Sequence, residues 1–177
     1  MDNALVICVI SWLIAGIFAQ AVKHKLLDWP RFRASFVAYR IVPEGLVTVV
    51  GRGLTVVELV LVCGLIFLQP AALWLAAGVL SVYASGIAVN VLRGRQQIDC
   101  GCGDEPTPVS WLLVLRNITL VVMAIYASIL AAASFELSVL SALIALGLMV
   151  IAFVLYSAIE QLLANRGRHQ RLWLGVS

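Results

Sequence analysis

Five long apolar segments dominate the chain, and short polar stretches separate them. A helix of about 20 residues crosses the roughly 30 Å hydrocarbon core of a bilayer, and each segment reaches about that length. Only Gln69 and Pro70 separate the second segment from the third, which predicts a tight helical hairpin. We therefore predict an all-α integral membrane protein, a helical bundle with spans at about residues 4–22, 46–68, 71–92, 111–133 and 137–163.

Composition places the chain in the membrane class. Apolar residues make up 63% of it and its mean hydropathy is +1.05, whereas soluble domains contain about 45–50% apolar residues. A length of 177 residues suits one domain, so we expect a single transmembrane domain at 1–164 and a basic cytoplasmic tail at 165–177. The first apolar segment has no basic leader and no Ala-x-Ala cleavage site, which predicts a retained helix rather than a signal peptide.

The positions of Lys and Arg indicate how the chain crosses the bilayer. The loops after the first and third spans and the tail contain nearly all of them, whereas the amino terminus and the other two turns contain none. By the positive-inside rule, the amino terminus lies outside and the carboxyl terminus in the cytoplasm, which puts the loop at 93–110 on the cytoplasmic face. The chain has no basic stripe interleaved with aromatic residues, so we expect no nucleic-acid partner.

Aromatic and basic side chains alternate between the first two spans. This mixture is typical of a helix or loop that lies in the membrane interface, with its basic side chains reaching to the lipid headgroups. The aromatic residues are Trp29, Phe32, Phe36 and Tyr39, and the basic ones are Arg31, Arg33 and Arg40.

The loop between the third and fourth spans contains two cysteines separated by one glycine. That spacing lets the Cα atoms of Cys100 and Cys102 approach within the roughly 4.4–6.8 Å that a disulfide needs. Gly101 and Gly103 favour this approach because glycine accepts backbone angles that other residues resist. A bridge that closes so small a ring is expected to be strained and to exchange readily. We predict a dithiol/disulfide pair as the catalytic site; the alternative is a polar turn with incidental cysteines.

Charged and polar side chains inside the spans are the next candidates. Glu58 lies near the middle of the second span, and Arg116 and Asn117 lie about two turns into the fourth. Because an isolated charge there costs several kcal/mol, we predict that Glu58 and Arg116 pair, either as a structural ion pair or as part of the site. In the second case Arg116 lies near the cysteine loop and stabilises a thiolate. Two further arginines of the loop, Arg93 and Arg95, would also stabilise a thiolate. Three acids of the loop oppose this effect: Asp99, Asp104 and Glu105.

Four other residues have weaker signals. Arg52 and Glu160 fall near span ends, where charged side chains usually anchor a helix at the interface. Cys8 and Cys63 fall in the outer halves of the first two spans, so they form either a second redox pair or, as buried cysteines usually do, part of the apolar packing. Two loop cysteines are fewer than the four ligands of a structural zinc site, and we predict no metal centre.

These motifs resemble those of the methylamine-utilisation protein E (MauE) family of bacterial membrane proteins. The resemblance rests on Asn90–Arg95, on Ile98–Gly103 with its Asp-Cys-Gly-Cys motif, and on Arg116-Asn117. It implies a four-helix core like that of DoxX-like membrane proteins, here with a fifth transmembrane helix, in the bacterial inner membrane. It also implies two partners: a membrane-anchored thioredoxin-like protein and the disulfide-rich, periplasmic small subunit of methylamine dehydrogenase.

Together the cysteines and the resemblance favour a membrane thiol–disulfide oxidoreductase. It would support disulfide formation, processing or transport of the dehydrogenase small subunit, with Cys100 and Cys102 as the exchanging pair. In one variant the pair passes electrons to a quinone, and Arg116 near the loop favours that variant. The main alternative is a non-catalytic membrane assembly or transport factor for the same client. A solute channel is disfavoured because few polar residues line any span.

Overall fold

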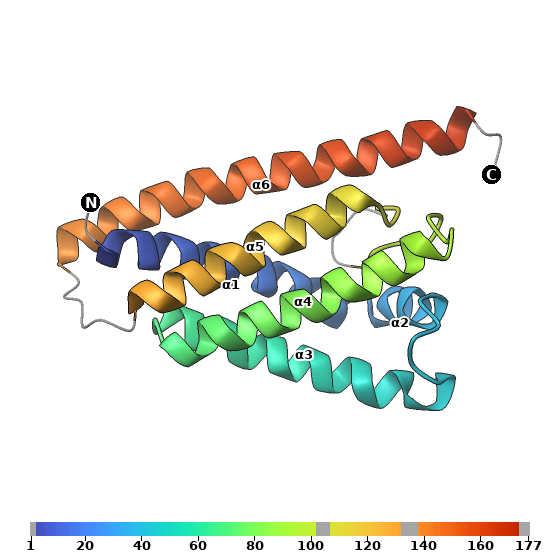
Figure 1. Ribbon diagram of the computed structural model, residues 1–177, viewed down its shortest axis with the longest axis horizontal. Coiled ribbons are helices and arrows are strands. Elements are labelled where there is room, and N and C mark those ends of the chain that lie inside the picture. The colour runs from blue at the N-terminus through green and yellow to red at the C-terminus, as the bar shows by residue number, and fades with distance from the viewer. Residues whose placement is uncertain (1–2, 102–106, 132–137, 174–177) are drawn as a thin grey trace.

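The computed structural model of the chain describes residues 3–101, 107–131 and 138–173, with side chains up to residue 165. Within these ranges the chain forms six helices and no strand longer than a single bridge. Five of the helices are long and apolar enough to cross a membrane, which confirms the predicted all-α, multi-pass bundle (Figure 1). The helices are α1 (Asn3–Leu27), α2 (Trp29–Ala38), α3 (Glu44–Ile66), α4 (Pro70–Leu92), α5 (Trp111–Ala131) and α6 (Val139–Trp173).

Two helices extend beyond the spans predicted from hydropathy. The first span was expected to end near Val22, but α1 continues through Lys25 to Leu27. The last was expected to end near Leu163, but α6 continues to Trp173. Lys, Arg, Gln and Leu are good helix formers, so the helical backbone continues where the hydropathy falls.

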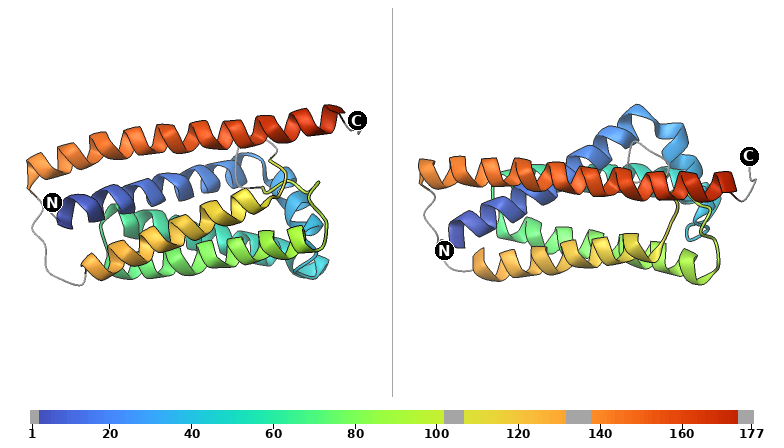
Figure 2. Two further views of the ribbon diagram at one scale, coloured as in Figure 1. Left: turned by 45° about the horizontal axis from the view of Figure 1, so that its top comes forward. Right: turned by 90° about the horizontal axis from the view of Figure 1, so that it is seen from above.

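Four helices form the core of the bundle. The buried cluster at its centre takes side chains from α1, α3, α4 and α5, and Figures 1 and 2 show α6 lying along the outside against α1. This arrangement is the expected four-helix core with a fifth transmembrane helix. Its members include Ile14 and Phe18 on α1, Leu61 and Leu65 on α3, Leu73 and Ala76 on α4, and Leu120 and Ala124 on α5.

Small residues allow close helix packing at two points. A Cβ atom on Gly64 would lie 2.8 Å from the Cβ of Ala72, so α3 and α4 meet tightly beside their connecting turn. A Cβ atom on Gly16 would lie 3.2 Å from the ring of Phe153, where α6 packs on α1. Away from the turn, α3 and α4 separate, and α2 lies at that end of the bundle (Figure 1).

The predicted interfacial segment contains a short helix, α2. Asp28 caps it, because its Oδ1 accepts a hydrogen bond from the backbone N of Arg31 at 3.2 Å, and Pro30 occupies the first turn. The helix buries Phe32 and Ser35, while Arg33 is exposed. This arrangement turns one face of α2 inward, toward the loop that contains the cysteines.

Candidate functional site

The first half of the cysteine loop folds back on its second half. Asp99 and Pro108 form an antiparallel bridge, flanked by hydrogen bonds from Cys100 N to Thr107 O at 2.8 Å and from Val109 N to Ile98 O at 3.0 Å. Cys100 therefore lies in a short paired segment rather than in an open turn. Cys102, Gly103, Asp104 and Glu105 lie outside the described residues.

Asp99 organises this loop with both of its carboxylate oxygens. Its Oδ1 accepts hydrogen bonds from the backbone N of Gly101 at 3.2 Å and of Thr107 at 3.0 Å. Its Oδ2 accepts from Arg31 on α2, from Nε at 3.3 Å and Nη2 at 3.1 Å. The acid that the sequence suggested as an opposing charge is thus neutralised by an arginine and holds the loop onto α2.

Two more contacts fix the loop against α2. Gly101 adopts a left-handed conformation with φ of 71°, and a Cβ atom there would lie 3.2 Å from the Cβ of buried Ser35. Any other residue at this position would be strained and would also push against α2. The hydroxyl of Tyr39 donates to the carbonyl oxygen of Cys100 at 3.4 Å.

Cys100 is buried, with 9% of its surface exposed. It belongs to an apolar cluster between α4, α5 and the loop, which includes Ile87, Val91, Val109 and Leu113. Its backbone is held by the bridge and its side chain by the cluster. The position of this thiol is therefore set by the fold.

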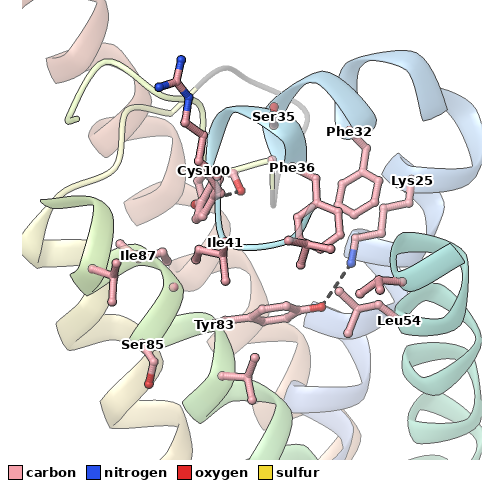
Figure 3. Close-up of a pocket in the computed structure, with 18 of the residues that line it drawn as sticks. Lys25, Phe32, Ser35, Phe36, Ile41, Leu54, Tyr83, Ser85, Ile87 and Cys100 are labelled. Carbon is pink, nitrogen blue, oxygen red and sulfur yellow. Dashed lines mark hydrogen bonds between the residues drawn. The ribbon is translucent and has the colours of Figure 1, made fainter. Parts of the chain in front are cut away.

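A cavity of about 680 Å³ adjoins this loop. It lies between α2, α3 and α4, in the region where α3 and α4 separate, and its wall is mostly apolar. Figure 3 shows Cys100 on one side of it, with Lys25 and Tyr83 across from it. Among the predicted site residues, the cavity wall includes Cys100 and Arg93.

A buried ion pair lies at the far side of the cavity. Lys25 Nζ lies 2.5 Å from Glu58 Oε1, and the side chains are 4% and 0% exposed. The hydroxyl of Tyr83 donates to the same oxygen of Glu58 and accepts from Lys25 Nζ at 3.2 Å. The ammonium also lies 4.9 Å from the ring centre of Phe32, which adds a cation–π contact. These contacts join α1, α2, α3 and α4.

The predicted pairing of Glu58 with Arg116 is therefore wrong. Glu58 pairs with Lys25, and Arg116 on α5 pairs with Glu160 on α6, with Nη1 2.6 Å from Oε1. Glu160 is thus part of an interhelical ion pair rather than a separate anchor. The guanidinium of Arg52, the other suggested anchor, lies 5.7 Å from the ring centre of Trp29. In each case the rotation of the helix about its axis determines which side chain the charged residue contacts, and the spacing of residues along the chain does not indicate that rotation.

The remaining supporting candidates lie in separate places. Asn117 is buried and donates to Leu113 O at 2.9 Å on its own helix, which satisfies its amide group locally. Arg93 is exposed at the end of α4. Arg95 has a buried Nη1 with no hydrogen-bond partner among the described residues. A role for either loop arginine beside the thiols stays a prediction.

The other cysteines do not form a pair. Cys8 is buried and Cys63 is exposed, and both are free thiols. Among the ranges that the structure describes, no group of three or more His, Cys, Asp or Glu side chains is arranged to bind a metal ion.

Sequence analysis missed the three side chains that connect these groups. Lys25 was counted among the loop charges, Arg31 among the interfacial ones, and Tyr83 carried no signal in an apolar span. A lysine near a helix end and an acid directly before Cys100 were the available signals. Only the packing of α1, α2 and α4 shows which charges meet.

The family of the chain follows from a comparison with known proteins. The family model for methylamine utilisation protein MauE matches residues 3–131. The chain belongs to the MauE family. The match covers α1 to α5, with the four-helix core, α2 and the cysteine loop, and ends at the last residue of α5. The α6 helix lies outside it.

Relatives named methylamine utilization protein MauE occur in several bacteria. The protein from Paracoccus denitrificans is 40% identical over 126 residues, which cover 68% of this chain and 67% of that relative. The protein from Paracoccus versutus is 36% identical over 121 residues, which cover 66% of this chain and 65% of that relative. The protein from Methylophilus methylotrophus is 32% identical over 157 residues, which cover 85% of this chain and 82% of that relative. No solved structure matches the chain. Membership identifies it as an accessory protein of methylamine utilisation.

Removing one partner of the buried ion pair is expected to destabilise the bundle. In Lys25→Met the carboxylate of Glu58 is left buried without its counter-charge, and the free energy of unfolding should fall by about 3–5 kcal/mol. Replacing both residues, as Lys25→Met with Glu58→Leu, should recover most of that loss. Equilibrium unfolding in detergent measures both, with exposed Lys23→Met as the matched control. Equal stability of the Lys25 and Lys23 variants would contradict this role.

Releasing the cysteine loop from α2 is expected to expose Cys100. In a chain whose other three cysteines are replaced, Arg31→Gln removes both donors to Asp99 Oδ2. Maleimide should then react with Cys100 roughly fivefold faster, as expected when a contact of about 1 kcal/mol that keeps the loop closed is lost. Arg33→Gln, two residues along the same helix and exposed, is the control. An unchanged rate in Arg31→Gln would show that the ion pair does not keep the loop closed.

Proposed function

We propose that this protein is a membrane thiol–disulfide exchange protein that supports maturation of the methylamine dehydrogenase small subunit. Its exchanging groups are Cys100 and Cys102, and its partner is a membrane-anchored thioredoxin-like protein. The observation that carries the proposal is the construction of the cysteine loop. Asp99, Gly101 and Tyr39 hold it onto α2 and so fix Cys100 at the edge of the bundle.

The exchange itself needs no group beyond the two cysteines and a partner. A thiolate attacks one sulfur of a disulfide, forms a mixed disulfide and releases the other sulfur as a thiolate. The second cysteine of the attacking pair then attacks the sulfur of its own neighbour in the mixed disulfide and releases the other protein, so that the attacking dithiol becomes a disulfide and the attacked disulfide becomes a dithiol. The burial of Cys100 supports Cys102 as the residue that meets the partner, because the attacking sulfur needs a clear approach.

The structure of the loop supports such a division of work. A fixed Cys100 loses little conformational entropy when it closes a disulfide or resolves a mixed one. An incidental cysteine in a polar turn would need no bridge, no ion pair between Arg31 and Asp99 and no positive-φ glycine to hold it. The alternative of a simple turn therefore explains fewer of the contacts around Cys100.

Orientation is a further part of the proposal. The basic residues of α2 and of the loop after α4 favour the cytoplasmic side of the bacterial inner membrane for this end, with the amino terminus outside. The dehydrogenase small subunit is expected to be periplasmic. In this orientation, electrons that pass between that client and the Cys100–Cys102 pair therefore need a carrier across the membrane.

A non-catalytic assembly or transport factor is the second candidate function. The observation that favours it is the surface of α6, which leaves large apolar residues such as Leu143, Ile151 and Leu162 exposed. Lipid covers such a surface, and so would a membrane-anchored client or partner. In that case the cysteines would be dispensable and the outer face of α6 would determine activity.

Cysteine substitution distinguishes these two functions. In a bacterium that uses the protein to make methylamine dehydrogenase, Cys100→Ser and Cys102→Ser should each lower the yield of active enzyme to that of a strain lacking the protein. Cys63→Ser, which changes an exposed cysteine on α3, is the control. One of the two single mutants should also trap a mixed disulfide with the thioredoxin-like partner. Full activity in both mutants would overturn the exchange function and leave the assembly role.

A further inference from the structure

The cavity beside Cys100 opens to the outer surface of the bundle. It opens where α3 and α4 separate, and several of its wall residues are also exposed on the outer surface of these helices. Val50 on α3 is 40% exposed and Val82 on α4 is 67% exposed. A volume of about 680 Å³ falls within the roughly 300–1,000 Å³ of small-molecule sites, and mostly apolar walls suit a lipid-soluble ligand.

One side of the cavity offers a hydrogen-bond donor. Lys25 Nζ has three hydrogens, of which two are directed to Glu58 and Tyr83. Apart from the ring of Phe32, the third has no hydrogen-bond acceptor among the described residues. Figure 3 shows its nitrogen directed toward Tyr83 at the cavity wall. A neutral carbonyl oxygen is the natural acceptor for such a group in apolar surroundings, because a polar group buried without a partner costs free energy.

The same cluster contains a carboxylate behind the cavity wall. Oε2 of Glu58 is buried and has no hydrogen-bond partner among the described residues. Glu58 lies directly behind Lys25 and Tyr83, bonded to both. Glu58 does not line the cavity, so it exchanges a proton with a bound group only through Lys25 and Tyr83, which do. A group that takes up protons when it is reduced would be served by this relay. An acyl chain or an ordinary phospholipid ester is not such a group.

We propose that this cavity binds the head of an isoprenoid quinone and that the quinone oxidises the Cys100–Cys102 dithiol. The inference rests on the proposed exchange function and assigns its direction. A quinone carbonyl faces Lys25 and Tyr83, the ring fills the apolar space toward Cys100, and the isoprenoid tail leaves between α3 and α4. The sequence favoured a quinone because Arg116 was expected near the cysteine loop. That reason does not hold, because Arg116 pairs with Glu160 and is not part of the cavity wall.

The reaction balances without another reactant. The dithiol gives up two electrons and two protons as its S–S bond forms, and the quinone takes up both to become a quinol. Lys25, Tyr83 and Glu58 hold and transfer protons at the carbonyl that faces them. The quinol then exchanges with the membrane pool, and the disulfide is available to oxidise the dithiol of the thioredoxin-like partner.

Binding is tested separately from chemistry, with the full chain in lipid nanodiscs and a short-chain azido-ubiquinone as a photoreactive probe. Gly86 faces the cavity, where a Cβ atom would lie 3.5 Å from Ile41, so Gly86→Leu places its side chain in the ligand space. Gly78, on the same helix, has open space around it and serves as the control through Gly78→Leu. We expect labelling of the wild type and Gly78→Leu and roughly tenfold weaker binding in Gly86→Leu, a change of about 1.4 kcal/mol.

Two further variants keep the test decisive. Val50→Phe fills the cavity from α3, so it should weaken labelling even if Gly86→Leu fails to fold. Tyr83→Phe keeps the ring but removes the hydroxyl that bonds to Glu58 and Lys25, and should weaken binding roughly fivefold because the ammonium of Lys25 loses one of the hydrogen bonds that position it. Equal labelling of wild type, Gly86→Leu and Val50→Phe would overturn the proposal. So would labelling that excess unlabelled ubiquinone does not displace, since that identifies an unspecific lipid groove.

The redox step is followed by mixing the reduced protein with short-chain ubiquinone without oxygen and measuring quinol and free thiols. Wild type and Gly78→Leu should form about one quinol per dithiol lost, and Gly86→Leu should do so at least tenfold more slowly. A double Cys100→Ser, Cys102→Ser variant should bind the probe but form no quinol. If the wild type exchanges disulfides with its partner yet forms no quinol, the quinone step fails and the exchange function stands. If both cysteine variants support maturation, the exchange function itself fails.

Discussion

The structure depends on a lysine and a glutamate that are both buried inside an apolar bundle. Lys25 and Glu58 join α1 to α3, and Tyr83 adds α4 to the same cluster. Either charge alone would cost several kcal/mol in this environment, so neither helix can rotate or slide far without losing its counter-charge. Because α2 begins four residues after Lys25, the ion pair also fixes where α2 starts.

The position of α2 in turn determines the geometry at Cys100. Arg31, Ser35 and Tyr39 all follow Lys25 within α2 or just after it, and each contacts the cysteine loop. The buried ion pair, the short helix and the loop thus form one connected structure around the cavity. The family match covers this whole structure.

Much of the architecture could be predicted from the sequence because it follows from hydropathy alone. Five spans, a hairpin at Gln69-Pro70 and a distinct cysteine loop need only the length and polarity of each segment. The ion pairs could not be predicted in this way, because sequence spacing gives the height of a residue along a helix and not its rotation toward a neighbour. Lys25 shows a second reason. It follows the apolar segment directly and counts as a loop charge, yet α1 continues past it and buries it beside the middle of α3.

The central claim is that Cys100 and Cys102 alternate between dithiol and disulfide in the membrane. The most direct measurement is maleimide labelling of this pair in intact and in opened cells, with and without prior reduction, in strains with and without the thioredoxin-like partner. The account predicts that part of the pair reacts only after reduction, and that this part changes when the partner is removed. Labelling that changes neither with reductant nor with removal of the partner, in intact or in opened cells, would contradict it.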